Sequence, residues 1–196
     1  MKKLVSTLLA TAMLVGLGAA FAQASSHDVE IRIPNVLQLR IVNGSSLAAA
    51  SSPSVTFDFQ ANQAAYLDLV NAGGGELAPT SVTNFSDVIV FSNRASWTVT
   101  VSAGEITFDN NLGLAGATNL GISLADIIVR PSGTPGANVS TLEASWSLTG
   151  GTIATGVRTQ GWRNLGFGGA DYRFAVNGDE DPGTYTTTVT YTIAAP

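Results

Sequence analysis

Few side chains of this sequence could do chemistry, and their types argue against most enzyme classes. The chain has one histidine, His27, and no cysteine. Serine and cysteine nucleophiles usually need a histidine base held in place, and His27 lies near the N-terminus, where chains are usually mobile. Zinc sites need several thiolate or imidazole ligands. We therefore predict a non-enzymatic protein with no catalytic residues.

The carboxylates suggest two further kinds of chemistry, glycoside hydrolysis and calcium binding. Glycosidases need two carboxyl groups that face each other across the substrate, and the acidic residues here are scattered over turns and outward-facing positions. The run Asp179-Glu180-Asp181 carries the oxygen ligands that Ca²⁺ prefers, but it lacks the spaced acidic loop of known calcium motifs. No metal site is expected. A Ca²⁺ ion at Asp179 and Asp181 is a secondary hypothesis, and a charged turn is its alternative.

The three tryptophans could serve either binding or packing. Trp97 alternates with Val99 on the apolar side of a predicted strand, and Trp146 lies in another apolar segment, so we expect both in the core. Trp162 lies in a glycine-rich loop. An exposed ring there could stack on a sugar or a partner, whereas a loop folded over the core would bury it. The candidate ligand-binding residues are Trp162, Arg163 and Phe167.

The N-terminal segment has the pattern of a secretory signal peptide. Lys2 and Lys3 precede an apolar run that ends at the small-x-small sequence Ala22-Gln23-Ala24. We expect residues 1–24 to be a signal helix that is removed, and residues 25–196 to form a single domain. If the protein is exported, its expected location is the cell surface, the cell envelope or the medium. In a host with an outer membrane, the expected location is the periplasm. No second long apolar run follows, so the processed chain should not span a membrane.

Charge and composition narrow the partners and the fold class. The formal net charge is −5, and both lysines lie in the predicted signal segment, so binding to nucleic acid is not expected. Charged residues make up only 12% of the chain. Abundant Thr, Ser, Gly and Asn are typical instead of β-strands with hydroxyl-bearing outer faces, joined by tight turns.

Alternation of apolar and polar residues predicts an all-β protein. Residues 29–41 read as one long strand, or as two strands with a break at Pro34, and residues 88–91 and 97–101 are expected to pair as a hairpin. The strand over 185–193 has apolar and aromatic residues on one face and threonines on the other. Further strands are expected over 142–148 and 172–176, and a short helix over 62–70.

The turns complete the fold prediction. Asp181-Pro-Gly183-Thr-Tyr185 has the form of a tyrosine corner, in which the hydroxyl bonds back to the preceding turn. The segment 161–170 is too rich in glycine for a regular element, so we expect it to be flexible. Many short strands joined by Gly and Pro turns predict an immunoglobulin-like β-sandwich of antiparallel sheets after the N-terminal signal helix.

Two strands resemble motifs of the WxL-domain family of bacterial surface proteins. The family motif Tyr-x-x-x-Leu-Thr-Trp-x-Leu is matched near the C-terminus, with Val, Tyr and Ile in place of Leu, Trp and Leu. Its earlier Trp-x-Leu motif is matched with Val in place of Leu. The matching residues are Trp97, Val99, Tyr185, Val189, Thr190, Tyr191 and Ile193. The resemblance implies a non-catalytic module that associates with peptidoglycan, another envelope polymer or surface proteins.

The ending GTYTTTVTYTI is also similar to spore-coat-U-like and archaic chaperone–usher pilin subunits. Those proteins are incomplete sandwiches that accept a strand from a neighbouring subunit. This second resemblance implies a self-assembling pilus or coat subunit, with residues 29–41 as the donor strand. Such subunits usually contain cysteine, and this chain has none.

Overall fold

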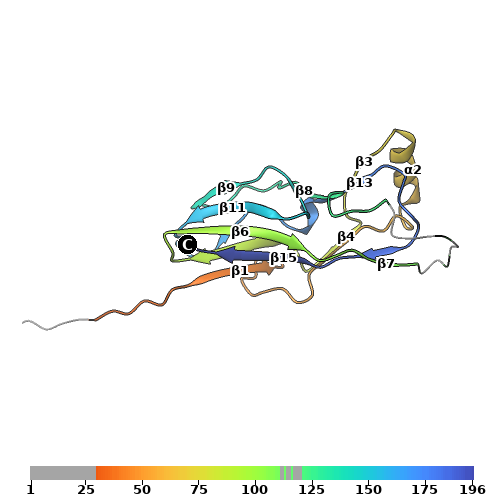
Figure 1. The fold of residues 1–196 in the computed structure, drawn as a ribbon. Helices are drawn as coiled ribbons and strands as arrows, with labels where there is room; N and C mark the ends of the chain where they lie inside the picture. Colours follow the sequence, from red (N-terminus) through yellow and green to blue (C-terminus); the bar gives the residue numbers. More distant parts are fainter. Residues whose placement is uncertain (1–29, 111–112, 114–115, 117–120) are drawn as a thin grey trace, which may run out of the picture. The chain divides into compact units, whose positions relative to one another are not determined.

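The computed structural model describes residues 30–110, 113, 116 and 121–196. The predicted signal peptide, His27 and Val29 lie outside the described residues. The chain divides into two units, Met1–Pro34 and Asn35–Pro196. The second unit carries every helix and strand that the structure describes (Figure 1). Within the described part, no helix has the length and apolar character needed to cross a membrane.

The fold is all-β, as the alternation predicts, and its strands pair antiparallel. Two sheets contain the strands of six or more residues, and we call them the larger sheets for that reason. The first has three strands in the order β1–β5–β12, with β1 over Leu37–Val42, β5 over Asp87–Ser92 and β12 over Arg163–Asn164. The other has the order β15–β6–β11–β9, with β15 over Val189–Ala194, β6 over Ser96–Ala103, β11 over Gly151–Val157 and β9 over Val139–Leu142.

Smaller elements extend this framework. A further sheet has the order β10–β8–β13–β3, with β10 over Trp146–Ser147, β8 over Ile127–Val129, β13 over Tyr172–Val176 and β3 over Gly75–Leu77. Two pairs are β14 (Thr184–Thr186) with β7 (Thr107–Asp109), and β2 (Ser54–Thr56) with β4 (Ser81–Thr83). The α-helix α2 covers Gln63–Asn71, where a helix is predicted, and the 3₁₀-helix η1 covers Gly169–Asp171.

Side chains from both larger sheets meet in one hydrophobic core. Val90 of β5 and Val99 of β6 are fully buried in it. Trp97 is 1% exposed, and its indole N–H donates to the main-chain oxygen of Val157 at 2.7 Å. Trp146 is partly buried and packs against this core. The expected packing role of both tryptophans is thus confirmed.

The predicted hairpin between residues 88–91 and 97–101 is wrong, because β5 and β6 belong to different sheets. At the end of β5, the main chain of Ser92 bonds to Thr159 instead. The Ser92 N–H donates to Thr159 Oγ1 at 2.8 Å, and the Ser92 oxygen accepts the Thr159 N–H at 2.8 Å. The connection after β5 therefore crosses from one larger sheet to the other.

The predicted C-terminal strand is divided in two. β14 pairs with β7 and β15 pairs with β6, with a shift of register between the two pairs. Residues 187 and 188 connect the two halves and bond to Gly104, which follows β6. The Gly104 N–H donates to Thr188 O at 2.9 Å, and the Gly104 oxygen accepts Thr187 Oγ1–H at 2.8 Å. The predicted tyrosine corner is confirmed, because the Tyr185 hydroxyl donates to Asp181 O at 2.8 Å.

Three other strand predictions need correction. Residues 142–148 do not form one strand, since Leu142 ends β9 and β10 lies in a different sheet. Strand β11 was not predicted, because a register shift near Ile153 buries both Ile153 and Ala154 and so breaks the alternation. Of residues 29–41, only the part from Leu37 onward pairs in a sheet.

Candidate functional site

The three predicted ligand-binding residues lie in one segment but in different surroundings. Trp162 is partly buried beside β5, with its ring 5.7 Å from the Phe91 ring. Arg163 is partly buried, and its guanidinium donates to the Gln160 main-chain oxygen at 2.9 Å. Phe167 is 1% exposed. The structure does not bring these three side chains together at one surface.

Phe167 belongs to the core. Its ring centroid lies 4.9 Å from that of Trp146 and 5.4 Å from that of Tyr191. A ring enclosed in this way offers no surface to a ligand unless the core opens. The structure therefore gives Phe167 a packing role in place of the predicted contact with a ligand.

Trp162 is held by a cation–π contact with Arg40 of β1. The guanidinium carbon lies 4.4 Å from the Trp162 ring centroid, within the range where the ring quadrupole attracts a cation. The same guanidinium donates to Leu47 O at 2.7 Å and to Gln38 Oε1 at 3.2 Å. Arg40 therefore covers part of the Trp162 ring, and its hydrogen bond to Leu47 anchors the loop that follows β1.

The glycine-rich segment around Phe167 is an ordered part of the packing, contrary to the expected flexibility. The N–H of Leu165 donates to Val88 O at 2.8 Å, and the N–H of Gly169 donates to Phe85 O at 3.1 Å. A Cβ atom on Gly168 would lie 1.8 Å from Ser86 O. The glycine at this position is needed for close approach of two backbones, which Cβ atoms would prevent.

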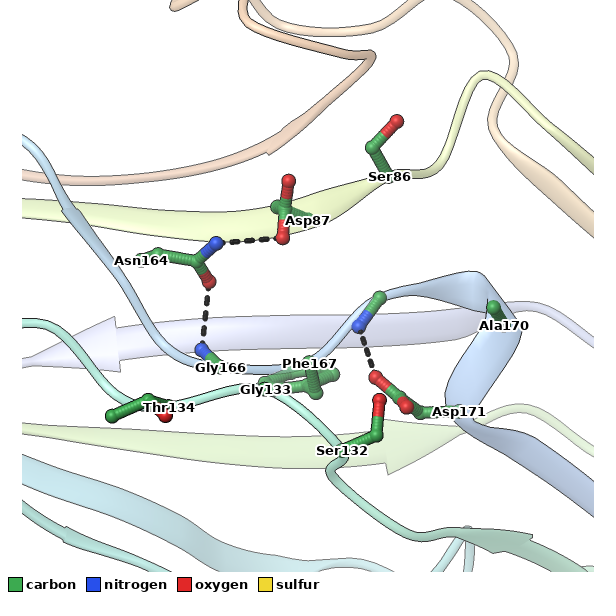
Figure 2. Close-up of a pocket in the computed structure, with 11 residues that line it drawn as sticks. Ser86, Asp87, Ser132, Gly133, Thr134, Asn164, Gly166, Phe167, Ala170 and Asp171 are labelled. Atoms are coloured by element: carbon green, nitrogen blue, oxygen red, sulfur yellow. Dashed lines mark hydrogen bonds between the residues drawn. The ribbon is translucent and has the colours of Figure 1, made fainter.

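A polar hollow of about 190 Å³ lies against this segment (Figure 2). Two carboxylates line it, Asp87 from β5 and Asp171 from η1. Asn164 Nδ2 donates to Asp87 Oδ1 at 2.6 Å, and Asp171 Oδ2 accepts the Gly168 N–H at 2.8 Å. Sequence reasoning missed this hollow because Asp87 and Asp171 are far apart in the chain and no local motif joins them.

The acidic run near the C-terminus forms a hydrogen-bonded turn. The Glu180 carboxylate accepts the N–H groups of Asn177 and Gly178 at 2.8 and 2.9 Å, and the Tyr66 hydroxyl at 2.8 Å. Burial and this bond raise the pKa of Tyr66 to about 12. Over the described residues there is no group of three or more His, Cys, Asp or Glu side chains that could hold a metal ion.

Strands β1 and β15 meet along a seam between the two larger sheets. Each is an edge strand, and they contact each other without ladder hydrogen bonds (Figure 1). Their core-facing side chains are only partly buried, whereas Val88 and Val99 on the neighbouring strands are fully buried. We define the seam by these six side chains: Leu37, Leu39, Ile41, Val189, Tyr191 and Ile193.

Tyr191 shows that the seam faces the core. Its hydroxyl lies 2.6 Å from the Tyr172 hydroxyl. Burial raises the pKa of Tyr172 to about 12 and holds the pKa of Tyr191 well above its ordinary value. Both hydroxyls therefore stay protonated over the physiological pH range, and they can share this hydrogen bond without charge.

Residues 30–34, which we call the arm, form an extended and exposed segment. Ile31 is 77% exposed and Ile33 is 76% exposed. Arg32, which lies between them in sequence, forms an ion pair with Glu30 at 2.7 Å. Since side chains alternate along an extended chain, the arm has an apolar face and a charged face, as a β-strand has. The structure assigns the arm to no sheet.

Comparisons with protein-family models, with curated proteins and with solved structures found no match for this chain. Its class is therefore defined by the fold alone. It is an all-β chain with an unpaired seam between two edge strands and with an exposed amphipathic arm.

Proposed function

We propose that this protein is a non-catalytic, exported subunit of a cell-surface assembly, and that its copies join by addition of a β-strand. In this proposal, residues 35–196 are an immunoglobulin-like β-sandwich that lacks one edge strand. The arm of one copy pairs with the edge of β15 in the next. The observation that carries the proposal is the exposure of Ile31 and Ile33 on an arm that belongs to no sheet.

Both halves of such a contact have a physical cost when they stay apart. The outer edge of β15 leaves a row of N–H and C=O groups without ladder partners, which is the usual template for pairing with another chain. Ile31 and Ile33 expose apolar surface to water. Burial of each side chain stabilises by at most about 1.5–3 kcal/mol. Strand addition would satisfy the edge and bury the apolar face together.

The length of the arm fits the edge of β15. If the signal peptide is removed after Ala24, residues 25–34 remain before the domain, and an extended strand of that length spans about 33 Å. The β15 strand is six residues long. The arm and the preceding residues 25–29 are therefore together long enough to pair along the whole edge.

The proposal predicts that charge on the apolar face of the arm abolishes assembly. In Ile31→Asp/Ile33→Asp, two carboxylates would have to be buried against the seam, at a cost of several kcal/mol without partners. We expect the unmodified chain to form concentration-dependent polymers in light scattering, and the variant to remain monomeric. Circular dichroism should show the same strand content in both.

The matched control is Leu47→Asp, which places a charge on an exposed leucine, 53% accessible, in the loop after β1. This variant should assemble as the unmodified chain does. Assembly of Ile31→Asp/Ile33→Asp at the unmodified level would contradict strand addition by the arm.

A second candidate function is that of a WxL-like module that binds peptidoglycan or a surface partner. The observation that favours it is the partly exposed Trp162 ring beside Arg40, on the same segment as the polar hollow. Aromatic side chains next to hydrogen-bonding groups are common at binding sites.

This candidate predicts that the protein is retained on purified peptidoglycan at low salt. Trp162→Ala should lower the retained fraction by roughly tenfold if the ring is a main contact, as for a hot-spot aromatic residue. A pull-down followed by quantitative blotting measures the fraction. Absence of retention, or equal retention of Trp162→Ala, would count against this function.

A further inference from the structure

We infer that Arg158, which lies beside Arg94 at one end of the seam, receives the Glu30 carboxylate of the incoming arm from a second copy. This contact would fix the direction of the added strand as antiparallel to β15. The inference rests on the proposed strand addition and specifies the partner residue and the orientation of that contact.

Arg94 and Arg158 line a second hollow, of about 250 Å³, which Asn35, Asn93 and Pro196 also border. The Arg94 guanidinium donates to Pro196 O at 3.0 Å, and Arg158 Nε donates to Asn93 O at 3.1 Å. The Asn93 oxygen is a neutral peptide carbonyl, whereas Pro196 is the last residue of the sequence and its oxygen belongs to a carboxylate. The remaining N–H groups of the two guanidinium ions can serve a further acceptor.

Two arginines and the terminal Pro196 line this hollow, which leaves one positive charge in excess within an acidic chain. The ion pairs of the described residues are Arg32 with Glu30 and Arg130 with Glu76. In that part of the chain, neither Arg94 nor Arg158 has an Asp or Glu partner. Arg94 bonds to the terminal Pro196, so Arg158 is the guanidinium that a further carboxylate can neutralise. The formal net charge is −5. Guanidinium groups bind carboxylates through paired hydrogen bonds, so this hollow fits a carboxylate ligand.

The hollow lies at the end of the seam where β1 begins and β15 ends. Val36, just before β1, donates its N–H to Asn93 Oδ1 at 2.8 Å, and its oxygen accepts the Asn93 N–H at 3.1 Å. Pro196 follows β15 directly. β1 therefore runs away from the hollow, and β15 runs toward it.

These strand directions decide how the arm must enter. A strand antiparallel to β15 has its N-terminal end at the hollow, so Glu30 reaches the arginines while Ile31 and Ile33 lie along the seam. A parallel strand would bring Pro34 to the arginines and carry Glu30 away from them. The Glu30–Arg32 pair within the arm is no obstacle, because both side chains are largely exposed, and exposed ion pairs contribute little.

Charge reversal tests the contact. Glu30→Arg and Arg158→Glu should each weaken association about tenfold, and the double variant should return to within about threefold of the unmodified chain, as a double-mutant cycle requires for a direct pair. Sedimentation of the full chain, expressed in a host that exports it, measures the association constants. The control is Glu30→Arg combined with Arg173→Glu, which has the same formal charge and should stay as weak as Glu30→Arg alone.

The outcomes separate this inference from the proposal beneath it. If the double variant is no stronger than the single variants while Ile31→Asp/Ile33→Asp still abolishes assembly, the arginine contact is wrong and strand addition stands. If the unmodified chain does not associate, both are wrong. Recovery in the double variant, without recovery in the Arg173 control, supports the arginine contact.

Discussion

Replacement of Trp97 by alanine is expected to lower the free energy of unfolding by about 3–5 kcal/mol, the usual range for loss of a fully buried large ring. Trp97 is 1% exposed, and it packs in the core where both larger sheets meet. Its ring also fills the space above Gly156, where a Cβ atom would lie 2.0 Å from the indole. The substitution leaves a cavity and removes the donor to Val157 O.

Urea denaturation followed by circular dichroism measures this loss. Trp162→Ala is the matched control, because Trp162 is partly exposed and packs against Arg40 and Phe91. It should lower the unfolding free energy by about 1–2 kcal/mol, since less area returns to water. Equal losses for the two tryptophan variants would mean that Trp97 does not occupy the core position described.

Gly168→Ala is expected to lower the unfolding free energy by more than about 4 kcal/mol, or to prevent folding, because a new methyl group would overlap backbone atoms. The added Cβ atom would lie 1.8 Å from Ser86 O and 2.6 Å from Ser86 C. The neighbouring bond from Gly169 N–H to Phe85 O holds that backbone in place. Gly168 has an ordinary extended conformation, with φ −151° and ψ −167°, so the penalty is purely steric.

Gly104→Ala serves as the control for this substitution. The nearest atom to an added Cβ there is Thr188 O, at 3.9 Å, which is ordinary contact distance. Its expected effect is within about 0.5 kcal/mol, as for other substitutions that create no strain. Thermal unfolding of the two alanine variants compares them. If Gly168→Ala unfolds at the same temperature as Gly104→Ala, the segment is flexible and the described packing is wrong.

Local patterns predicted what depends on a single strand or turn. The alternation of residues 172–176 and of residues 189–193 predicted β13 and β15, and the spacing of Trp97 and Val99 predicted their burial. The tyrosine corner at Tyr185 was predictable because its donor and acceptor lie in one short motif. Periodicity reports which face of a strand is buried, and it is strongest for such isolated elements.

Pairing between strands was not predictable in the same way. β5 and β6 are adjacent in sequence and both are apolar, but they belong to different sheets. At the end of β5, Ser92 bonds to Thr159, which is distant in the chain. The glycines at 166 and 168 read as flexible because composition cannot distinguish a loose loop from a close backbone approach.

The candidate sites show the same limit. The polar hollow is lined by Asp87 and Asp171, and the second hollow is lined by Arg94 and Arg158. The two residues of each pair are far apart in the sequence, so no local motif could reveal either hollow. The alternating arm was visible in the sequence. However, the donor strand suggested by the pilin resemblance covered residues 29–41, whereas residues 37–42 pair with β5 in the same chain. Only the part before Asn35 is left to act as a donor.

The most direct test of strand addition is the molar mass of the unmodified chain in neutral buffer over a wide range of concentration. Sedimentation equilibrium should show an average molar mass that rises with concentration from one copy to long polymers. In these polymers the arm of each copy pairs with strand β15, Val189–Ala194, of the next. A mass of one copy at every concentration, with the arm intact, would contradict the central claim.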